Sequence, residues 1–127
     1  MQRQTIQTTI KNWGQQYKYL LNIMKQFTIF QLNENNNEAH NFMYMGYYFI
    51  KKHNMKLTLD LYKKVYEGNI ANTTEQSETN ILDEIYRTFN MAHHADFKGH
   101  SLSTSDIVLM DGKYFYCDSY GWTEVKF

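Results

Sequence analysis

Cysteine is nearly absent from this 127-residue chain, in which Cys117 stands alone. A single cysteine excludes a disulfide framework, and its place in an apolar strand pattern indicates a buried, unreactive thiol. No apolar run approaches the roughly 18 residues of a membrane-spanning helix, and no signal-peptide pattern is present. We therefore expect a soluble, cytoplasmic protein that makes no membrane contact.

Motifs that carry enzymatic or cofactor chemistry are also missing. The sequence contains no Gly-rich phosphate loop, no CxxC pair and no HExxH segment. It also offers no pair of carboxylates that the pattern places across a cleft. We therefore expect no catalytic residue, no cofactor and no metal.

What the chain does contain is enough apolar residues for one hydrophobic core. Its composition is 43% hydrophobic and 17% aromatic, which excludes a disordered chain. The net charge is zero, yet residues 1–64 hold nine Lys/Arg against three Asp/Glu, and residues 65–127 hold four against ten. A neutral chain gives no reason to expect direct nucleic-acid binding. The two halves either neutralise each other or present charged faces to partners, for example an acidic C-terminal surface to a basic protein.

Apolar residues near the N-terminus recur at spacings of three and four, which is the pattern of an amphipathic helix. We expect this helix over residues 1–25 and an α+β domain over residues 26–127. Gly14 costs about 1 kcal/mol relative to alanine inside a helix, so the helix needs a surface to pack on. That surface is either its own domain or a partner, including a second copy in a homodimer. The stripe consists of Ile6, Ile10, Trp13, Tyr17, Leu20 and Met24.

The middle of the chain predicts two strands and two helices. Alternation indicates strands over 26–32 and about 62–67, the second ending at Gly68. A helical period predicts one helix from about Asn41 to His53, and residues 69–79 are expected to form a polar, mobile loop. Asn80 is expected to cap a second helix. The buried stripe of that helix is expected to be Leu82, Ile85, Tyr86 and Phe89.

Tyr44, Tyr47 and Tyr48 lie off the apolar stripe of the predicted 41–53 helix. Tyrosine is a frequent anchor of protein interfaces, because its ring is large and amphipathic. An exposed cluster would therefore indicate a partner-binding surface. The alternative is that the sheet or the N-terminal helix covers the three rings.

A β-hairpin is predicted around Asp111-Gly112, because this dipeptide between two β-rich runs favours a two-residue type I′ turn. The turn sets Met110 opposite Lys113 and fixes the register of both strands. Both faces of the hairpin are then largely apolar, so we expect cover on both sides. After a turn at 119–121, residues 122–127 are expected to form a closing strand. One face carries Ile107, Leu109, Tyr114 and Tyr116, and the other Val108, Met110, Phe115 and Cys117.

A run of short polar side chains from Gly99 to Asp106 precedes the hairpin. It fits a binding loop, a nucleophilic serine with His100 as base, or a loop whose Ser and Asp side chains satisfy nearby backbone groups. His93, His94 and His100 also lie close together around Asp96, and Cys117-Asp118 could approach them. Their spacing does not match that of a structural zinc site.

The segment from Asp96 to Val125 resembles the YodL-like domain, a small domain of Gram-positive bacteria and of their phages and plasmids. That family carries a D-F-x-G-H-S-[LM]-S-x-S-D-[IV] segment and, after a hairpin, a C/V-D-S-[FY]-G-[FW] turn. The resemblance extends more loosely back to about Phe27 and departs at His94, where the family usually has proline. It implies a mobile-element context and no particular mechanism. The matching residues are Asp96, Phe97, Gly99, His100, Ser101, Leu102, Ser103, Ser105, Asp106, Asp118, Ser119, Tyr120 and Gly121.

We expect an α+β fold with a mostly antiparallel sheet of four to five strands, two packed helices and the additional N-terminal helix. The preferred function is a small non-catalytic protein-binding protein of a phage or mobile element, which inhibits a host defence system of the anti-CRISPR or anti-restriction type. The alternative is a small-ligand or nucleotide-binding module that uses the His100–Asp106 loop. Candidate partner-binding residues are Tyr44, Tyr47, Tyr48, His100, Ser101, Ser103, Asp106, Asp118, Tyr120 and Trp122.

Overall fold

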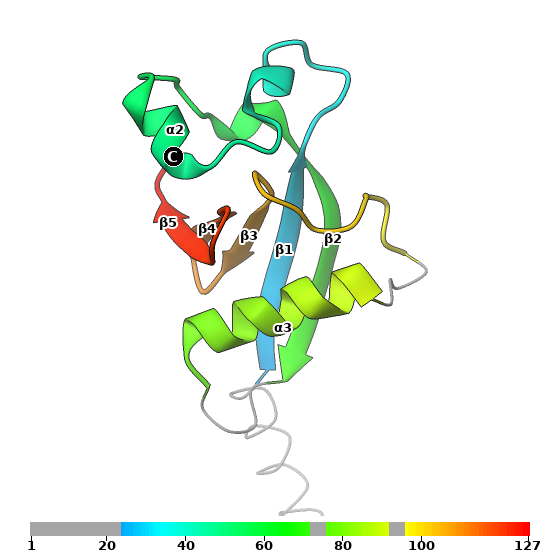
Figure 1. Cartoon of the computed structure of the whole chain (residues 1–127). Coiled ribbons are helices and arrows are strands. Elements are labelled where there is room, and N and C mark those ends of the chain that lie inside the picture. Colours follow the sequence, from blue (N-terminus) through cyan, green and yellow to red (C-terminus); the bar gives the residue numbers. More distant parts are fainter. Residues whose placement is uncertain (1–23, 72–75, 92–95) are drawn as a thin grey trace, which may run out of the picture.

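The protein is an α+β structure built on one five-stranded antiparallel sheet, seen here in a computed structural model. The structure describes residues 24–71, 76–91 and 96–127. The spatial order of the strands is β2-β1-β3-β4-β5, as Figure 1 shows. Residues 1–23 of the predicted N-terminal helix lie outside the described residues, and its last two residues, Met24 and Lys25, belong to strand β1 instead. The elements are β1 (Met24–Leu32), η1 (Ala39–Phe42), α2 (Tyr47–Lys52), η2 (Leu59–Leu61), β2 (Tyr62–Ala71), α3 (Glu78–Met91), β3 (Ile107–Met110), β4 (Lys113–Cys117) and β5 (Trp122–Val125).

The hairpin of β3 and β4 has the register that the sequence predicts. Met110 lies opposite Lys113 and Ile107 opposite Tyr116, and Asp111 and Gly112 both have positive φ, as a type I′ turn requires. Each face of the hairpin contributes to a different hydrophobic cluster. The prediction of a hairpin covered on both sides is therefore confirmed.

The two clusters lie on opposite faces of the sheet. Helix α3 crosses one face (Figure 1), and its side chains pack on residues of β1, β2, β3 and β4. The other face is covered by α2 and the loops around η1 and η2. Such two-sided burial explains why strand residues on both faces are apolar. Helix α3 contributes Ile81, Leu82, Ile85 and Phe89 to the first cluster.

The prediction of a single helix over residues 41–53 is wrong. The chain instead forms η1, an irregular segment and the six-residue α2. Tyr44 has a φ of 64°, which interrupts a helix. A Cβ at Gly46 would lie 3.0 Å from Ser119 Oγ, so this irregular segment packs tightly on the 119–121 turn. Tertiary contact therefore overrides the helical period. Among the described residues, α3 is the only helix of more than six residues.

Three other predicted boundaries also shift. Strand β2 does not end at Gly68 but continues to Ala71, because β1 pairs with it along its whole length. Helix α3 begins before Asn80, and Ser77 Oγ accepts the hydrogen bond from the Asn80 N–H.

The ring of Tyr86, predicted to be buried, is 41% exposed, and Ile81 of the same helix is buried instead. Strand β5 ends at Val125, and residues 72–75 of the predicted mobile loop lie outside the described residues.

Candidate functional site

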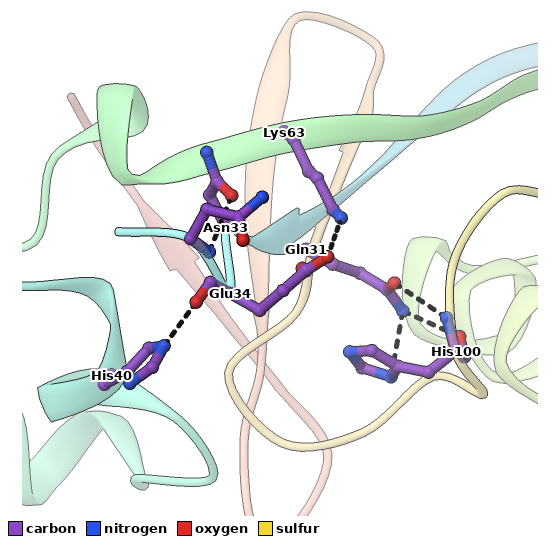
Figure 2. A network of polar contacts seen from close by, with 7 residues as sticks. Gln31, Asn33, Glu34, His40, Lys63 and His100 are labelled. Atoms are coloured by element: carbon purple, nitrogen blue, oxygen red, sulfur yellow. Dashed lines mark hydrogen bonds and ion pairs between the residues drawn. The ribbon is translucent and has the colours of Figure 1, made fainter. Parts of the chain in front are cut away.

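The side chain of Gln31, at the end of β1, holds the motif loop against the sheet. Its Nε2 donates to the His100 carbonyl oxygen at 2.8 Å, and its Oε1 accepts the His100 N–H at 3.1 Å. Figure 2 shows these two hydrogen bonds between the strand and the loop. Gly99 permits the approach, since a Cβ there would lie 2.1 Å from Gln31 Oε1. The glycine of the motif's Gly-His step is therefore required by packing.

Asp106 is the one carboxylate buried in this region, with 2% of its surface exposed. Its Oδ2 accepts hydrogen bonds from Gln31 Nε2 at 3.0 Å and from the Ser103 N–H at 2.9 Å. No described residue donates to its Oδ1. Burial raises the pKa of Asp106 to about 7, although these bonds and nearby His100 favour the charged form. The group therefore holds a proton for part of the time near neutral pH.

Ser105 links the motif loop to the segment that carries the tyrosines. It has a φ of 88°, and its Oγ accepts the Tyr44 N–H at 3.2 Å. Its carbonyl oxygen accepts a hydrogen bond from the hydroxyl of Tyr62 at 2.7 Å, and burial raises the pKa of that hydroxyl. The side chain and backbone of Ser105 are thus both committed to holding the fold together.

Asp118, just after β4, performs a similar task at the same open end of the hairpin as Ser105. Its Oδ1 accepts the backbone N–H groups of Tyr47 at 3.1 Å and Ser119 at 2.8 Å. Its Oδ2 accepts a hydrogen bond from the hydroxyl of Thr123 at 2.7 Å. One carboxylate therefore joins the start of α2, the 119–121 turn and β5.

A cavity of about 340 Å³ lies between the motif loop, the end of β1 and the segment around Tyr44. We call it the motif cavity. Gln31, Asp106 and Ser103 line it, and the Ser103 hydroxyl is buried without a hydrogen-bond partner among the described residues. Glu34, Lys63, Lys98 and His100 supply charged or titratable groups to the same cavity. Figure 2 shows the ion pair of Lys63 with Glu34 beside Gln31.

A second hollow of about 390 Å³ lies between α2, the 55–59 segment and the end of the described chain. We call it the α2 groove. Its walls include Ile50, Leu57 and Phe127. Three exposed lysines, Lys51, Lys56 and Lys126, also line it, and no acidic residue does. In the described part of the chain, these lysines form no salt bridge, and Lys51 Nζ lies 5.9 Å from the ring centre of Tyr47.

The predicted tyrosine cluster is divided by the break in the helix. Tyr48 is 78% exposed and Tyr44 68% exposed, while the ring of Tyr47 is half-buried and packs on Tyr116 at 5.4 Å. Tyr120, on the 119–121 turn, is 97% exposed. Since Asp118 bonds to both Tyr47 and Ser119, the turn and α2 lie at one end of the molecule.

The other candidate residues are mainly occupied within the fold. Trp122 is half-buried, and its Nε1 donates to Asp83 of α3 at 3.1 Å. The Nδ1 of His100 lies 2.7 Å from the carbonyl oxygen of Ser101, and so it contacts the backbone of that serine and not a hydroxyl. Cys117 is buried, and burial raises its thiol pKa to about 12. This confirms the prediction of a buried thiol.

The histidine cluster cannot be assembled from the described residues, because His93 and His94 lie outside them. No three His, Cys, Asp or Glu side chains come together as metal ligands within the described ranges 24–71, 76–91 and 96–127. Within those ranges, no helix has the length and apolar character needed to cross a membrane.

Gln31, the residue that connects the cavity to the motif, is not among the candidate residues from the sequence. Its only signal there is a polar side chain in an apolar alternation, Phe27 to Leu32. A buried amide in such a place must find hydrogen-bond partners, but the sequence does not say where those partners are.

A family model agrees with the resemblance seen in the sequence. The model of the YodL-like domain matches residues 26–127, which include every element described above except the first two residues of β1. Neither a curated protein nor a solved structure matches the chain.

Proposed function

We propose that this chain, which belongs to the YodL-like domain family, is a small non-catalytic protein that binds another protein through the α2 groove and the tyrosines beside it. The observation that carries the proposal is an apolar groove lined by three exposed lysines, with Tyr48, 78% exposed, on the same helix α2. Apolar side chains with adjacent unpaired charge are what a protein interface presents before its partner docks.

The chemistry of the groove selects the partner. Lys51, Lys56 and Lys126 favour an acidic surface, and the apolar wall favours a partner that inserts an aliphatic or aromatic side chain. Tyr48, exposed on α2, adds a further contact with the partner. An exposed tyrosine contributes a large contact area at low entropic cost. The partner is therefore a protein with an acidic, partly apolar patch.

The specific form of the proposal is inhibition of a host defence system, such as restriction or CRISPR, by a protein of a phage or other mobile element. A basic groove does not mimic DNA, so inhibition of that kind would not act by filling a DNA-binding channel. It would act by docking on an acidic protein surface of the defence component and blocking its assembly or motion.

Affinity capture from a host lysate tests this function. The full chain is compared with Tyr48→Ala, with the double variant Lys51→Glu/Lys126→Glu, and with Arg87→Glu as a control on α3, which covers the opposite face of the sheet. We expect one stoichiometric protein on the wild type and on the control, and its loss on the other two. Equal capture by all four proteins would reject the α2 groove as the interface.

A further inference from the structure

We propose that the motif cavity binds a small molecule that carries an amino group at one end and a carboxylate or phosphate at the other. The proposal concerns a different part of the molecule from the α2 groove, and neither depends on the other. Three observations carry it: a buried hydroxyl without a partner beside a buried carboxylate with one unused oxygen, a lysine and a histidine at the same cavity, and the volume of the cavity.

The first observation is that hydrogen-bonding capacity is left unused inside the cavity. Asp106 is 2% exposed and uses only Oδ2 within the fold. The Ser103 hydroxyl is buried, and no described residue bonds to it. Buried polar groups are normally satisfied, and the two belong to one cavity. An amino group satisfies both, since it donates to the Asp106 carboxylate and to the serine oxygen.

The second observation is the distribution of charge among the residues that line the cavity. Lys63 is already paired with Glu34 at 2.7 Å. Lys98 is exposed, and within the described residues it has no ion pair. His100, also exposed, uses Nδ1 for the backbone of Ser101, which leaves its Nε2 available. Lys98 and His100 together thus provide a place for an anionic group.

The third observation is size. A volume of about 340 Å³ lies within the range of roughly 300–1,000 Å³ that is usual for small-molecule sites. It is far larger than the roughly 30 Å³ that one water occupies. Tyr44, whose backbone is held by Ser105, and the apolar Leu32 and Met43 form part of the lining. The cavity thus has a polar end for the amino group and an apolar wall for the rest of the molecule.

The test is a titration of the full chain with matched probes. Binding is monitored through the amide NMR signals of Gly99–Asp106. The amino-acid arm uses single L-amino acids, including alanine with L-lactate as its analogue without the amino group. The nucleotide arm uses CMP, with UMP as its analogue without the amino group. We expect one arm to shift the loop signals saturably and its analogue to bind at least tenfold more weakly. Whichever arm binds identifies the source of the shared chemistry.

Two variants then locate the site. Asp106→Asn replaces the acceptor that faces the amino group, and Lys98→Ala removes the cation that faces the anion; each is expected to weaken binding at least tenfold. Lys64→Ala, on β2 but not part of the cavity lining, should leave binding unchanged. The proposal is overturned if no probe of either arm shifts the loop signals, or if both site variants bind as well as the wild type. The folding of each variant is checked by its amide spectrum away from the loop.

Discussion

Gln31 pairs its side-chain amide with both backbone polar groups of His100, which lies 69 residues further along the chain. The contact resembles one step of a β-ladder, but it is made by a side chain. It ties the motif loop to β1 and places Asp106 and Ser103 at one cavity. Most of the small polar residues in the motif therefore hold the loop, and only a few of their atoms remain for a ligand.

The close approach of Gly99 to Gln31 gives the first prediction. Gly99→Ala puts a Cβ into the space of the amide oxygen and is expected to lower the free energy of unfolding by about 1–3 kcal/mol. Gln31→Ala leaves both His100 backbone groups unpaired, at a cost of about 1–3 kcal/mol for each buried group. In the double variant the clash with the amide disappears, so the two costs should not add. Urea denaturation of all four proteins measures the coupling, and strictly additive costs would contradict the contact.

The protonation of Asp106 gives the second prediction. Because the folded pKa is about 7 and the unfolded value is about 3.9, the folded state binds the proton more tightly. Stability from this group is complete below about pH 4, falls as the pH rises to about 7, and is constant above that. The total change is on the order of 4 kcal/mol.

Asp106→Asn should remove this dependence while His100 and Tyr62, the nearby titratable groups, are retained. The difference in unfolding free energy between wild type and variant, followed by denaturant titration from pH 4 to pH 8, should move steadily in favour of the variant. A difference that does not change with pH would show that Asp106 ionises normally in the folded protein.

Asp118 supports the third prediction, which concerns dynamics. Asp118→Ala removes the acceptor for the Tyr47 and Ser119 N–H groups and for the Thr123 hydroxyl. We expect a loss of about 1–3 kcal/mol and faster hydrogen exchange at the Tyr47 and Ser119 amides. Asp118→Asn retains one acceptor oxygen and should have a smaller effect. Unchanged exchange at both amides in the alanine variant would refute the role of this carboxylate in holding α2.

Local turn chemistry and strand pattern predicted the C-terminal hairpin from the sequence in full. Asp111-Gly112 permits one turn type, and that turn sets every cross-strand pair. The 41–53 segment could not be predicted in the same way, because its break at Tyr44 depends on hydrogen bonds to Ser105 and, nearby, to Asp118. These partners are more than 60 residues away, and no local pattern contains that information.

The candidate site was predictable only in part, for a related reason. The polar run from Gly99 to Asp106 stands out in the sequence, and Ser103 and Asp106 do line a cavity. Gln31 and Lys63, which complete that cavity, come from strands whose approach to the loop is a product of the whole sheet. The α2 groove combines residues 47–59 with 126–127, and this juxtaposition likewise follows from the fold.

Calorimetric titration of the captured partner into the purified full chain tests the central claim, the α2 groove, most directly. Lys51→Glu/Lys126→Glu should weaken binding by at least tenfold, and higher salt should weaken the wild-type complex, since exposed charges are screened. The α3 control Arg87→Glu should bind as the wild type does. Equal affinity of the double variant and the wild type, with no dependence on salt, would contradict the assignment of the α2 groove as a protein-binding surface.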